Sequence, residues 1–575
     1  MRIKKYIVLL SILISVVFGV LEYLTSYFDS YIPSNCKSIH FTNIRKAIVI
    51  IPHQDDEIFT AGGLINQLCY HNIETEVVFL YDGNTFDNIE YIRKDEAIKS
   101  CKMLGCSEEN IKFLDFPNRL QKDTTNIPSL KRSGEYFAMR DSLILSISTF
   151  QPDLIICSDF DFHREHRILT LVFDDAINFL IKSERLNNPL ILKGFAYQTA
   201  YYARPDFFNI NLLSTLKPED PQNKQYDTDI PQYTWDLRLR IPLLRDCVTH
   251  SLFGNKIYKA ISKHKTQQVY HKALSTINSD IVFWERRTDN LLMNCKIKAS
   301  SGDVSHLNDY KLYFADNVSF DYKYNVNFDN YLWKPDSFDL NPWIEVEMKD
   351  STELSRISLY DSPDLDCNVT DIKITINDSL VLYTNNLNPS GSMTNIDMDS
   401  AIIVNKIRFD DIKIQKGIAG LSEIELLKNI QKEKRIDIFK IIDKDNDNFI
   451  YKYFVKSKTE KLNLDIYSTI DSNVIWQIVE NKGSVNLDES TLSFGEDFEY
   501  CVIKATSQSN PFLFDEVRIE YLSNIEQKMY NLMKGYEQQK LKLIENVLGF
   551  RPIEILFVTH STLTVIKRRI FGIWD

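Results

Sequence analysis

The chain has 575 residues, which is about four times a typical domain of roughly 150 residues and argues against one compact domain. Hydrophobic residues make up 44% and there are only 17 Gly and 17 Pro, which excludes a collagen-like or broadly disordered chain. The net charge of -12 argues against nucleic acid as the main partner. The nine cysteines include no Cys-x-x-Cys pair, so any metal must use other ligands.

The first 30 residues predict a membrane segment. Arg2, Lys4 and Lys5 precede a largely apolar run over 6–28, which just reaches across a bilayer of ~30 Å at about 1.5 Å per helical residue. The basic residues at the start predict a single-pass anchor with its N-terminus in the cytoplasm and the rest of the chain outside the cell membrane. A signal peptide that is cleaved, followed by secretion, is the alternative, although no A-x-A-like cleavage site follows.

Residues 45–285 alternate short β-branched runs with segments of helical periodicity. This alternation is typical of parallel βαβ units, so we expect a layered, Rossmann-like α/β domain with a mostly parallel sheet. In such a domain, ligands bind beyond the carboxyl ends of the strands. The predicted strands are 47–51, 76–80, 111–113, 154–157 and 190–196.

The remainder of the chain is punctuated by Asn, Asp and Ser between short strands, a pattern that favours antiparallel β-sandwiches. We expect one sandwich over 288–428 and a second, immunoglobulin-like sandwich over 435–524. A helical tail follows over 525–575, with helical periodicity over 525–546. We expect the terminal helix, which carries Lys567, Arg568 and Arg569, to dock onto the protein, and lying on a membrane surface is the alternative. The strands predicted in the two sandwiches are 343–348, 356–359, 372–376, 379–383, 406–409, 450–454, 462–466, 474–479 and 500–505.

Two polar clusters follow two of the strands predicted in the α/β domain. The first, over 53–57, follows the first strand, and the second, over 159–166, follows the strand at 154–157; each opens a helix. Acidic residues at such positions can be helix caps or first-turn charges. Because the two clusters occupy equivalent strand-to-helix junctions, however, they are expected to meet at one edge of the sheet.

The residue types in these clusters suit a catalytic metal. His53, Asp56 and His166 offer two imidazoles and a carboxylate, which suits Zn²⁺ and leaves a fourth position open for water. Zn²⁺ lowers the pKa of bound water to about 7, and Asp55 is placed to accept the proton of that water. His163 lies three residues before His166, so on a helical turn both would share one face. A histidine exposed at the start of the helix is the alternative for His163.

These motifs resemble the PIG-L/LmbE family of zinc hydrolases, the de-N-acetylases of N-acetylglucosaminyl-phosphatidylinositol and related sugars. The resemblance lies in His-Gln-Asp-Asp-Glu at 53–57, the stretch from Arg93 to Gly105, and the later His163-x-x-His166. The family usually has proline where this chain has Gln54.

The family resemblance implies a role for each of these residues. It implies that His53, Asp56 and His166 hold Zn²⁺, that Asp55 is the general base and that His163 stabilises the tetrahedral intermediate. It also implies a substrate-binding role for Arg93, for which a surface pair with Glu96 is the alternative. The implied reaction removes an acetyl group from an N-acetylglucosamine-type sugar.

Residues 288–428 resemble a discoidin, or galactose-binding-like, domain. The resemblance rests on Trp333-Lys334-Pro335, on Trp343-Ile344-Glu345-Val346 and on the closing stretch 420–425. It implies glycan binding, whereas packing in the core is the alternative for each tryptophan.

The predicted function is therefore a membrane-anchored zinc deacetylase that acts on an N-acetylated glycan, glycolipid or glycoside. A non-catalytic glycan-binding or adhesion protein with a relic deacetylase domain is one alternative. A scaffold with a structural metal is another, although no fourth protein ligand is evident. The sequence identifies neither the acetylated substrate nor the oligomeric state.

Overall fold

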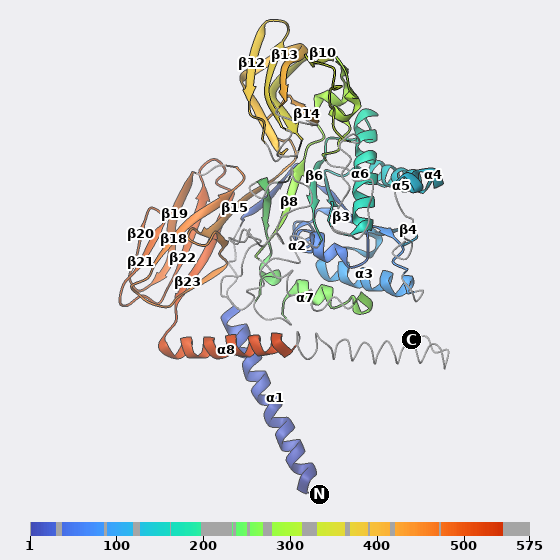
Figure 1. Ribbon diagram of the computed structural model, residues 1–575. Helices are drawn as coiled ribbons and strands as arrows, with labels where there is room; N and C mark the ends of the chain where they lie inside the picture. Colours follow the sequence, from blue (N-terminus) through green and yellow to red (C-terminus); the bar gives the residue numbers. More distant parts are fainter. Residues whose placement is uncertain are drawn as a thin grey trace, which may run out of the picture.

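The computed structural model comprises a long N-terminal helix, an α/β domain and two β-rich units, with a second long helix after them (Figure 1). The residues that the structure describes are 2–29, 37–84, 89–118, 127–161, 163–196, 233, 237–249, 254–267, 279–312, 331–362, 368–388, 391–414, 420–470 and 473–543.

The α/β domain is built on a seven-stranded sheet with the order β4-β3-β2-β5-β6-β8-β7. The first five strands in this order are parallel, as predicted, and β8 and β7 add an antiparallel edge that the sequence analysis missed. The predicted strand over 190–196 ends earlier, at Gly194. The strands are β2 (Lys46–Ile51), β3 (Glu74–Tyr81), β4 (Ile111–Phe116), β5 (Leu154–Ser158), β6 (Leu190–Gly194), β7 (Leu239–Pro242) and β8 (Asp280–Arg286).

Helices cover both faces of this sheet because its central strands are apolar on both sides. Ala47, Val49 and Ile51 of β2 pack into one hydrophobic core with α2, α3 and α7, whereas Ile48 and Ile50 pack into the other with α4, α5 and α6. This alternation follows from the two-residue period of a strand. The helices are α2 (Asp56–Tyr70), α3 (Glu90–Leu104), α4 (Ile127–Ser133), α5 (Glu135–Phe150), α6 (Arg164–Lys182) and α7 (Lys256–Ile261).

The middle unit is a six-stranded antiparallel sheet with the order β12-β11-β13-β10-β14, and β9 pairs with β10. The predicted strands 343–348 and 356–359 form one long strand, β10, whose pairing with β13 shifts register between Glu347 and Thr352. Trp333 is fully buried in the core of this unit, as in the packing alternative. The strands are β9 (Lys296–Ala299), β10 (Ile344–Asp361), β11 (Val369–Ile376), β12 (Leu380–Asn385), β13 (Met393–Ile414) and β14 (Leu421–Leu427).

The last β unit packs two sheets around a second apolar core. One sheet has the order β1-β15-β18-β21-β20 with β16 on β15, and the other has the order β17-β23-β22-β19. Strand β1 was not predicted: it precedes the α/β domain in the chain and pairs with β15, so the N-terminal segment belongs partly to this unit. The strands are β1 (Ile39–Thr42), β15 (Arg435–Asp443), β16 (Asn448–Phe449), β17 (Lys452–Val455), β18 (Lys461–Ser468), β19 (Val474–Lys482), β20 (Val485–Asp488), β21 (Thr491–Phe494), β22 (Tyr500–Ser507) and β23 (Phe514–Tyr521).

The two long terminal helices cross each other below the last β unit in Figure 1. They are α1 (Arg2–Asp29) and α8 (Asn524–Leu543). Phe28 of α1 packs against Tyr530 of α8 and Phe454 of β17, with ring centroids 5.3 and 5.8 Å apart. The described tail helix α8 thus packs against the protein, whereas the terminal stretch with Lys567, Arg568 and Arg569, for which docking is predicted, belongs to residues 544–575, outside the described part of the chain.

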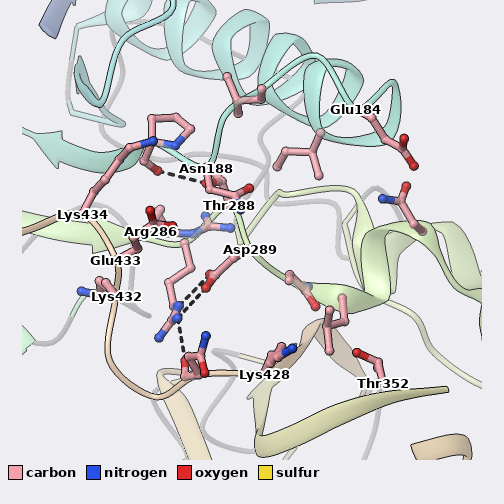
Figure 2. A pocket seen from close by; sticks show the side chains of 18 of the residues that line it. Glu184, Asn188, Arg286, Thr288, Asp289, Thr352, Lys428, Lys432, Glu433 and Lys434 are labelled. Carbon is pink, nitrogen blue, oxygen red and sulfur yellow. Dashed lines mark hydrogen bonds and ion pairs between the residues drawn. The ribbon is translucent and has the colours of Figure 1, made fainter. Parts of the chain in front are cut away.

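A cavity of about 510 Å³ opens between the α/β domain, the middle unit and the segment leading to the last unit (Figure 2). In this cavity the Arg287 guanidinium bridges Asp289 and the carbonyl oxygens of Asn429 and Ile430. The cavity is lined by Leu190, the first residue of β6, so it lies at the amino ends of the parallel strands. It is thus distinct from the polar clusters, which follow the carboxyl ends of β2 and β5.

Candidate metal centre

The two predicted polar clusters meet because β2 and β5 are neighbouring parallel strands. His53, Asp55 and Asp56 follow the end of β2, and His163 and His166 follow the end of β5. Four of these side chains are buried, and His163 is half-buried. The structure thus brings together residues separated by about 110 positions in the chain.

Three histidines form the centre of this cluster. The ligand nitrogens of His53, His163 and His166 lie within 4.8 Å of one another, an arrangement that can hold a metal ion. His163 is the N-cap of α6 with an extended backbone, so the expectation that it shares a helical face with His166 was wrong in detail. The two rings nevertheless come together, with centroids 4.6 Å apart.

Asp56 links two of these histidines. Its Oδ2 atom lies 3.0 Å from His53 Nδ1 and 3.1 Å from His166 Nε2. Neighbouring ligand atoms around one tetrahedral ion lie roughly 3.3–3.6 Å apart, given bonds of about 2.0–2.2 Å, so the observed distances are only a few tenths of an ångström shorter. The Oδ1 atom of Asp56 is buried and has no hydrogen-bond partner among the described residues. These three side chains therefore fit a divalent metal ion.

Two carboxylates with no predicted role contact the ring nitrogens of His53 and His166 that do not face Asp56. Glu165 Oε2 lies 2.8 Å from His53 Nε2, and Asp161 Oδ2 lies 2.7 Å from His166 Nδ1. A carboxylate on the far nitrogen fixes the orientation of a metal-binding imidazole and raises its basicity. Both residues lie within the cluster at 159–166, so the signal was present in the sequence but had no assigned role.

The concentration of buried carboxylates favours positive charge at the centre. Although burial opposes ionisation, the His166 charge and the hydrogen bonds from His166 and His53 hold the pKa of Asp56 well below its usual value. Burial likewise opposes protonation of His166, yet the neighbouring Asp161 and Asp56 raise its pKa to about 10. A proton or a metal cation satisfies this negative environment.

Asp55 is held in an unusual conformation beside the centre. Its backbone φ is 137°, a value that L-residues rarely adopt, so surrounding contacts must maintain it. The Asp55 N–H donates to Glu57 Oε2 at 2.9 Å, and Glu57 Oε1 lies 2.5 Å from His264 Nε2. Burial and the nearby Asp56 charge raise the pKa of Asp55 to about 6. His264 was not predicted, because it follows α7 about 200 residues from Glu57 and belongs to no local motif.

Arg93 is buried beside Asp55, so the alternative of a surface pair with Glu96 was wrong. Its guanidinium donates to the carbonyl oxygens of Gln54 and Gly83, and one nitrogen lies 3.6 Å from Asp55 Oδ1. Arg93 therefore joins the loops after β2 and β3 beside the centre.

Gln54 replaces the usual family proline and fits this junction closely. Its amide donates to the carbonyl oxygen of Tyr81 at 2.8 Å. At Gly83, which has φ +72°, an added Cβ would lie 2.1 Å from Gln54 Oε1. The glycine thus makes room for the glutamine.

A mostly parallel sheet with histidines and carboxylates gathered at the carboxyl ends of its strands defines an α/β protein with a candidate metal centre. Residues 48–177 match the PIG-L family, described as GlcNAc-PI de-N-acetylase, so the chain contains a PIG-L family domain. Deacetylases of this family are metal-dependent. Residues 290–427 match a domain of unknown function, DUF7402, and the discoidin resemblance of this region is not confirmed.

The similar proteins include deacetylases. Diacetylchitobiose deacetylase of Thermococcus kodakarensis is 22% identical over 214 residues, which cover 34% of this chain and 74% of that protein. The structure of N,N'-diacetylchitobiose deacetylase from Pyrococcus horikoshii is 15% identical, with 43% of this chain and 85% of that chain covered and a TM-score of 0.26. A family 32 carbohydrate-binding module from Streptococcus pneumoniae EndoD is 10% identical, with 24% of this chain and 99% of that chain covered and a TM-score of 0.19.

Proposed function

We propose that the α/β domain is a zinc-dependent deacetylase that removes the acetyl group from an N-acetylglucosamine-type sugar in a glycan, glycolipid or glycoside. The observation that carries this proposal is the approach of His53, Asp56 and His166 to within ligand distance of one another at the carboxyl edge of the sheet. Two imidazoles and one carboxylate are a donor set that suits Zn²⁺. The match to the PIG-L family and to diacetylchitobiose deacetylase supports an acetylated amino sugar as substrate.

His53, Asp56 and His166 would hold the metal. Bound Zn²⁺ supplies a Lewis acid for the amide carbonyl and lowers the pKa of a bound water to about 7. Asp55 then acts as the general base: with a pKa of about 6 it is ionised at neutral pH and is a better proton acceptor than an ordinary aspartate. The same carboxyl group returns the proton to the departing amine, so that acetate and the free amino sugar leave.

His163 is suited to stabilise the oxyanion as a neutral hydrogen-bond donor. Burial and the nearby His166 and His53 hold the pKa of His163 well below its usual value. Its Nδ1 accepts a hydrogen bond from the Glu165 N–H at 3.3 Å, so the proton of the neutral ring resides on Nε2. His163 would donate this N–H to the oxyanion of the tetrahedral intermediate, and a bound metal would supply further electrostatic stabilisation. Arg93, beside Asp55, is the proposed substrate-binding residue.

The test is a deacetylation assay on the full chain in detergent. Acetylated chitooligosaccharides and N-acetylglucosaminyl glycolipids would be supplied separately, with and without a chelator, and both acetate and free amine would be measured. We expect amine release that the chelator stops and that added Zn²⁺ restores. Loss of the base in Asp55→Asn should lower the rate by about 10²–10⁴-fold while bound zinc stays at the wild-type level. A zinc-loaded protein that binds the glycans and releases no amine would instead support the adhesion alternative.

We also propose that α1 anchors the protein in the cell membrane with the α/β domain outside. Its segment Leu9–Phe28 is long and apolar enough to cross a bilayer, and its apolar side chains from Leu9 to Val20 are exposed. The other end of the helix is built into the protein: Phe28 is buried, and Glu22 accepts a hydrogen bond from Tyr536 of α8. These contacts favour retention of the helix over cleavage. Intact mass of the protein from the membrane fraction tests this, since a secreted product lacking α1 would contradict it.

A further inference from the structure

Two cysteine thiols face each other at the ends of α2 and α3, away from the metal centre. Cys69 is the second-last residue of α2, and Cys106 is the second residue after α3. Their Sγ atoms lie 3.6 Å apart. The scattered cysteines of the sequence indicated no disulfide framework, so this proximity comes from the fold alone.

The backbone holds these two residues together through independent contacts. Gly105 ends α3 with φ +112°, and a Cβ added there would lie 2.9 Å from Cys69 Cβ, so only glycine permits this close approach. The side chain of Asn66 in α2 donates to the Leu104 carbonyl oxygen at 2.9 Å. The end of α3 is therefore fixed against α2, which keeps the two sulfurs near each other.

We propose that Cys69 and Cys106 form a disulfide bond when the protein meets a disulfide oxidant outside the cytoplasm. The thiolate of Cys69 attacks one sulfur of the oxidant, forms a mixed disulfide and releases one thiol of the oxidant. The thiolate of Cys106 then attacks Cys69 Sγ and releases the second thiol. The protein loses two protons and two electrons, and the oxidant gains them as two thiols.

The surroundings of the two thiols assign this order of attack. Cys69 is partly exposed and accessible to an oxidant, whereas Cys106 is 6% exposed. The hydrogen bond from Cys106 lowers the pKa of the Cys69 thiol against the effect of burial, and the same hydrogen bond raises the pKa of Cys106 well above its usual value. The neighbouring Cys101 is fully buried and is not accessible in the folded protein.

The bond would close a loop that contains β3, α3 and the buried Arg93. Asp56 and Cys69 lie at opposite ends of α2, 13 residues or about 20 Å apart, so the crosslink is remote from the metal centre. It should therefore stabilise the folded domain without changing the site.

The experiment treats the full chain in detergent with oxidised glutathione at pH about 8, followed by alkylation, intact mass and peptide mapping. With alkylation carried out in denaturant, we expect the oxidised wild type to retain seven of its nine thiols and to yield one crosslinked peptide joining Cys69 to Cys106. Oxidation should raise the midpoint of thermal unfolding by roughly 5–10 °C. Neither change should occur in Cys69→Ser or Cys106→Ser, and both should persist in the neighbouring control Cys101→Ser.

The proposal is overturned if Cys69 and Cys106 both remain alkylatable after the oxidant has fully oxidised a model dithiol. A crosslink from Cys69 to Cys101 would overturn it equally. Should a serine variant fail to fold, Cys106→Ala replaces it, since alanine suits a buried position. The mapping does not depend on catalysis, so its outcome is distinguishable from failure of the proposed deacetylase activity.

Discussion

Removal of the His264 imidazole tests how Asp55 is held in its unusual conformation. His264 and Glu57 are both fully buried, and the atoms His264 Nε2 and Glu57 Oε1 lie 2.5 Å apart. The other carboxylate oxygen of Glu57 accepts the Asp55 N–H. His264→Leu would leave Glu57 with a buried charge that has lost its partner, a change that costs about 3–5 kcal/mol of unfolding free energy. It would also loosen the hydrogen bond from the Asp55 N–H to Glu57, which holds the backbone of Asp55.

The control is His264→Gln, because the glutamine amide retains a donor for Glu57. Denaturant unfolding followed by circular dichroism measures the loss of stability, and acetate release measures the rate. We expect His264→Leu to lower the denaturant midpoint markedly and kcat by up to about 10²-fold, since small displacements of a catalytic group have effects of that size. His264→Gln should recover most of both losses, and bound zinc should change in neither variant. Equal midpoints and rates for wild type and His264→Leu would refute this account.

Three further predictions concern the same edge of the sheet. Asp161→Asn removes the charge behind His166 and should weaken zinc affinity by about 10–100-fold, as measured by competition with a chelating dye. Asp55 must be ionised to accept a proton and its pKa is about 6, so the rate should fall as the pH drops through about 6. A bound metal cation would lower the pKa of Asp55, and the fall in rate would then occur at a lower pH. A rate that stays constant down to pH 4 would contradict that role. Gly83 has φ +72°, and an added Cβ would meet Gln54 Oε1, so Gly83→Ala should lower the free energy of unfolding in denaturant by about 1–3 kcal/mol. Gly535 has open space around it, so Gly535→Ala should not lower the free energy of unfolding.

Local patterns determined much of the α/β domain. Four of the five parallel strands, β2, β3, β5 and β6, are largely buried on both faces, so each appears in the sequence as a short apolar run. All five predicted parallel strands are present, although the one predicted over 190–196 ends at Gly194. The clusters at 53–57 and 159–166 were likewise visible because each is contiguous in the chain. The carboxyl edge of a parallel sheet is where such clusters meet, so their proximity was predictable as well.

The tertiary structure alone decided the partners that come from distant parts of the chain. Strand β1 pairs with β15 almost 400 residues later, and His264 meets Glu57 across 207 positions. No repeating residue pattern in the sequence indicates either contact, because a hydrogen bond or strand pairing between remote segments requires only one suitable residue on each side. The burial of Arg93 and the facing thiols of Cys69 and Cys106 follow in the same way from how helices pack on the sheet. The sequence by itself thus determined the chemical groups of the centre, whereas the packing of remote segments decided which groups position them.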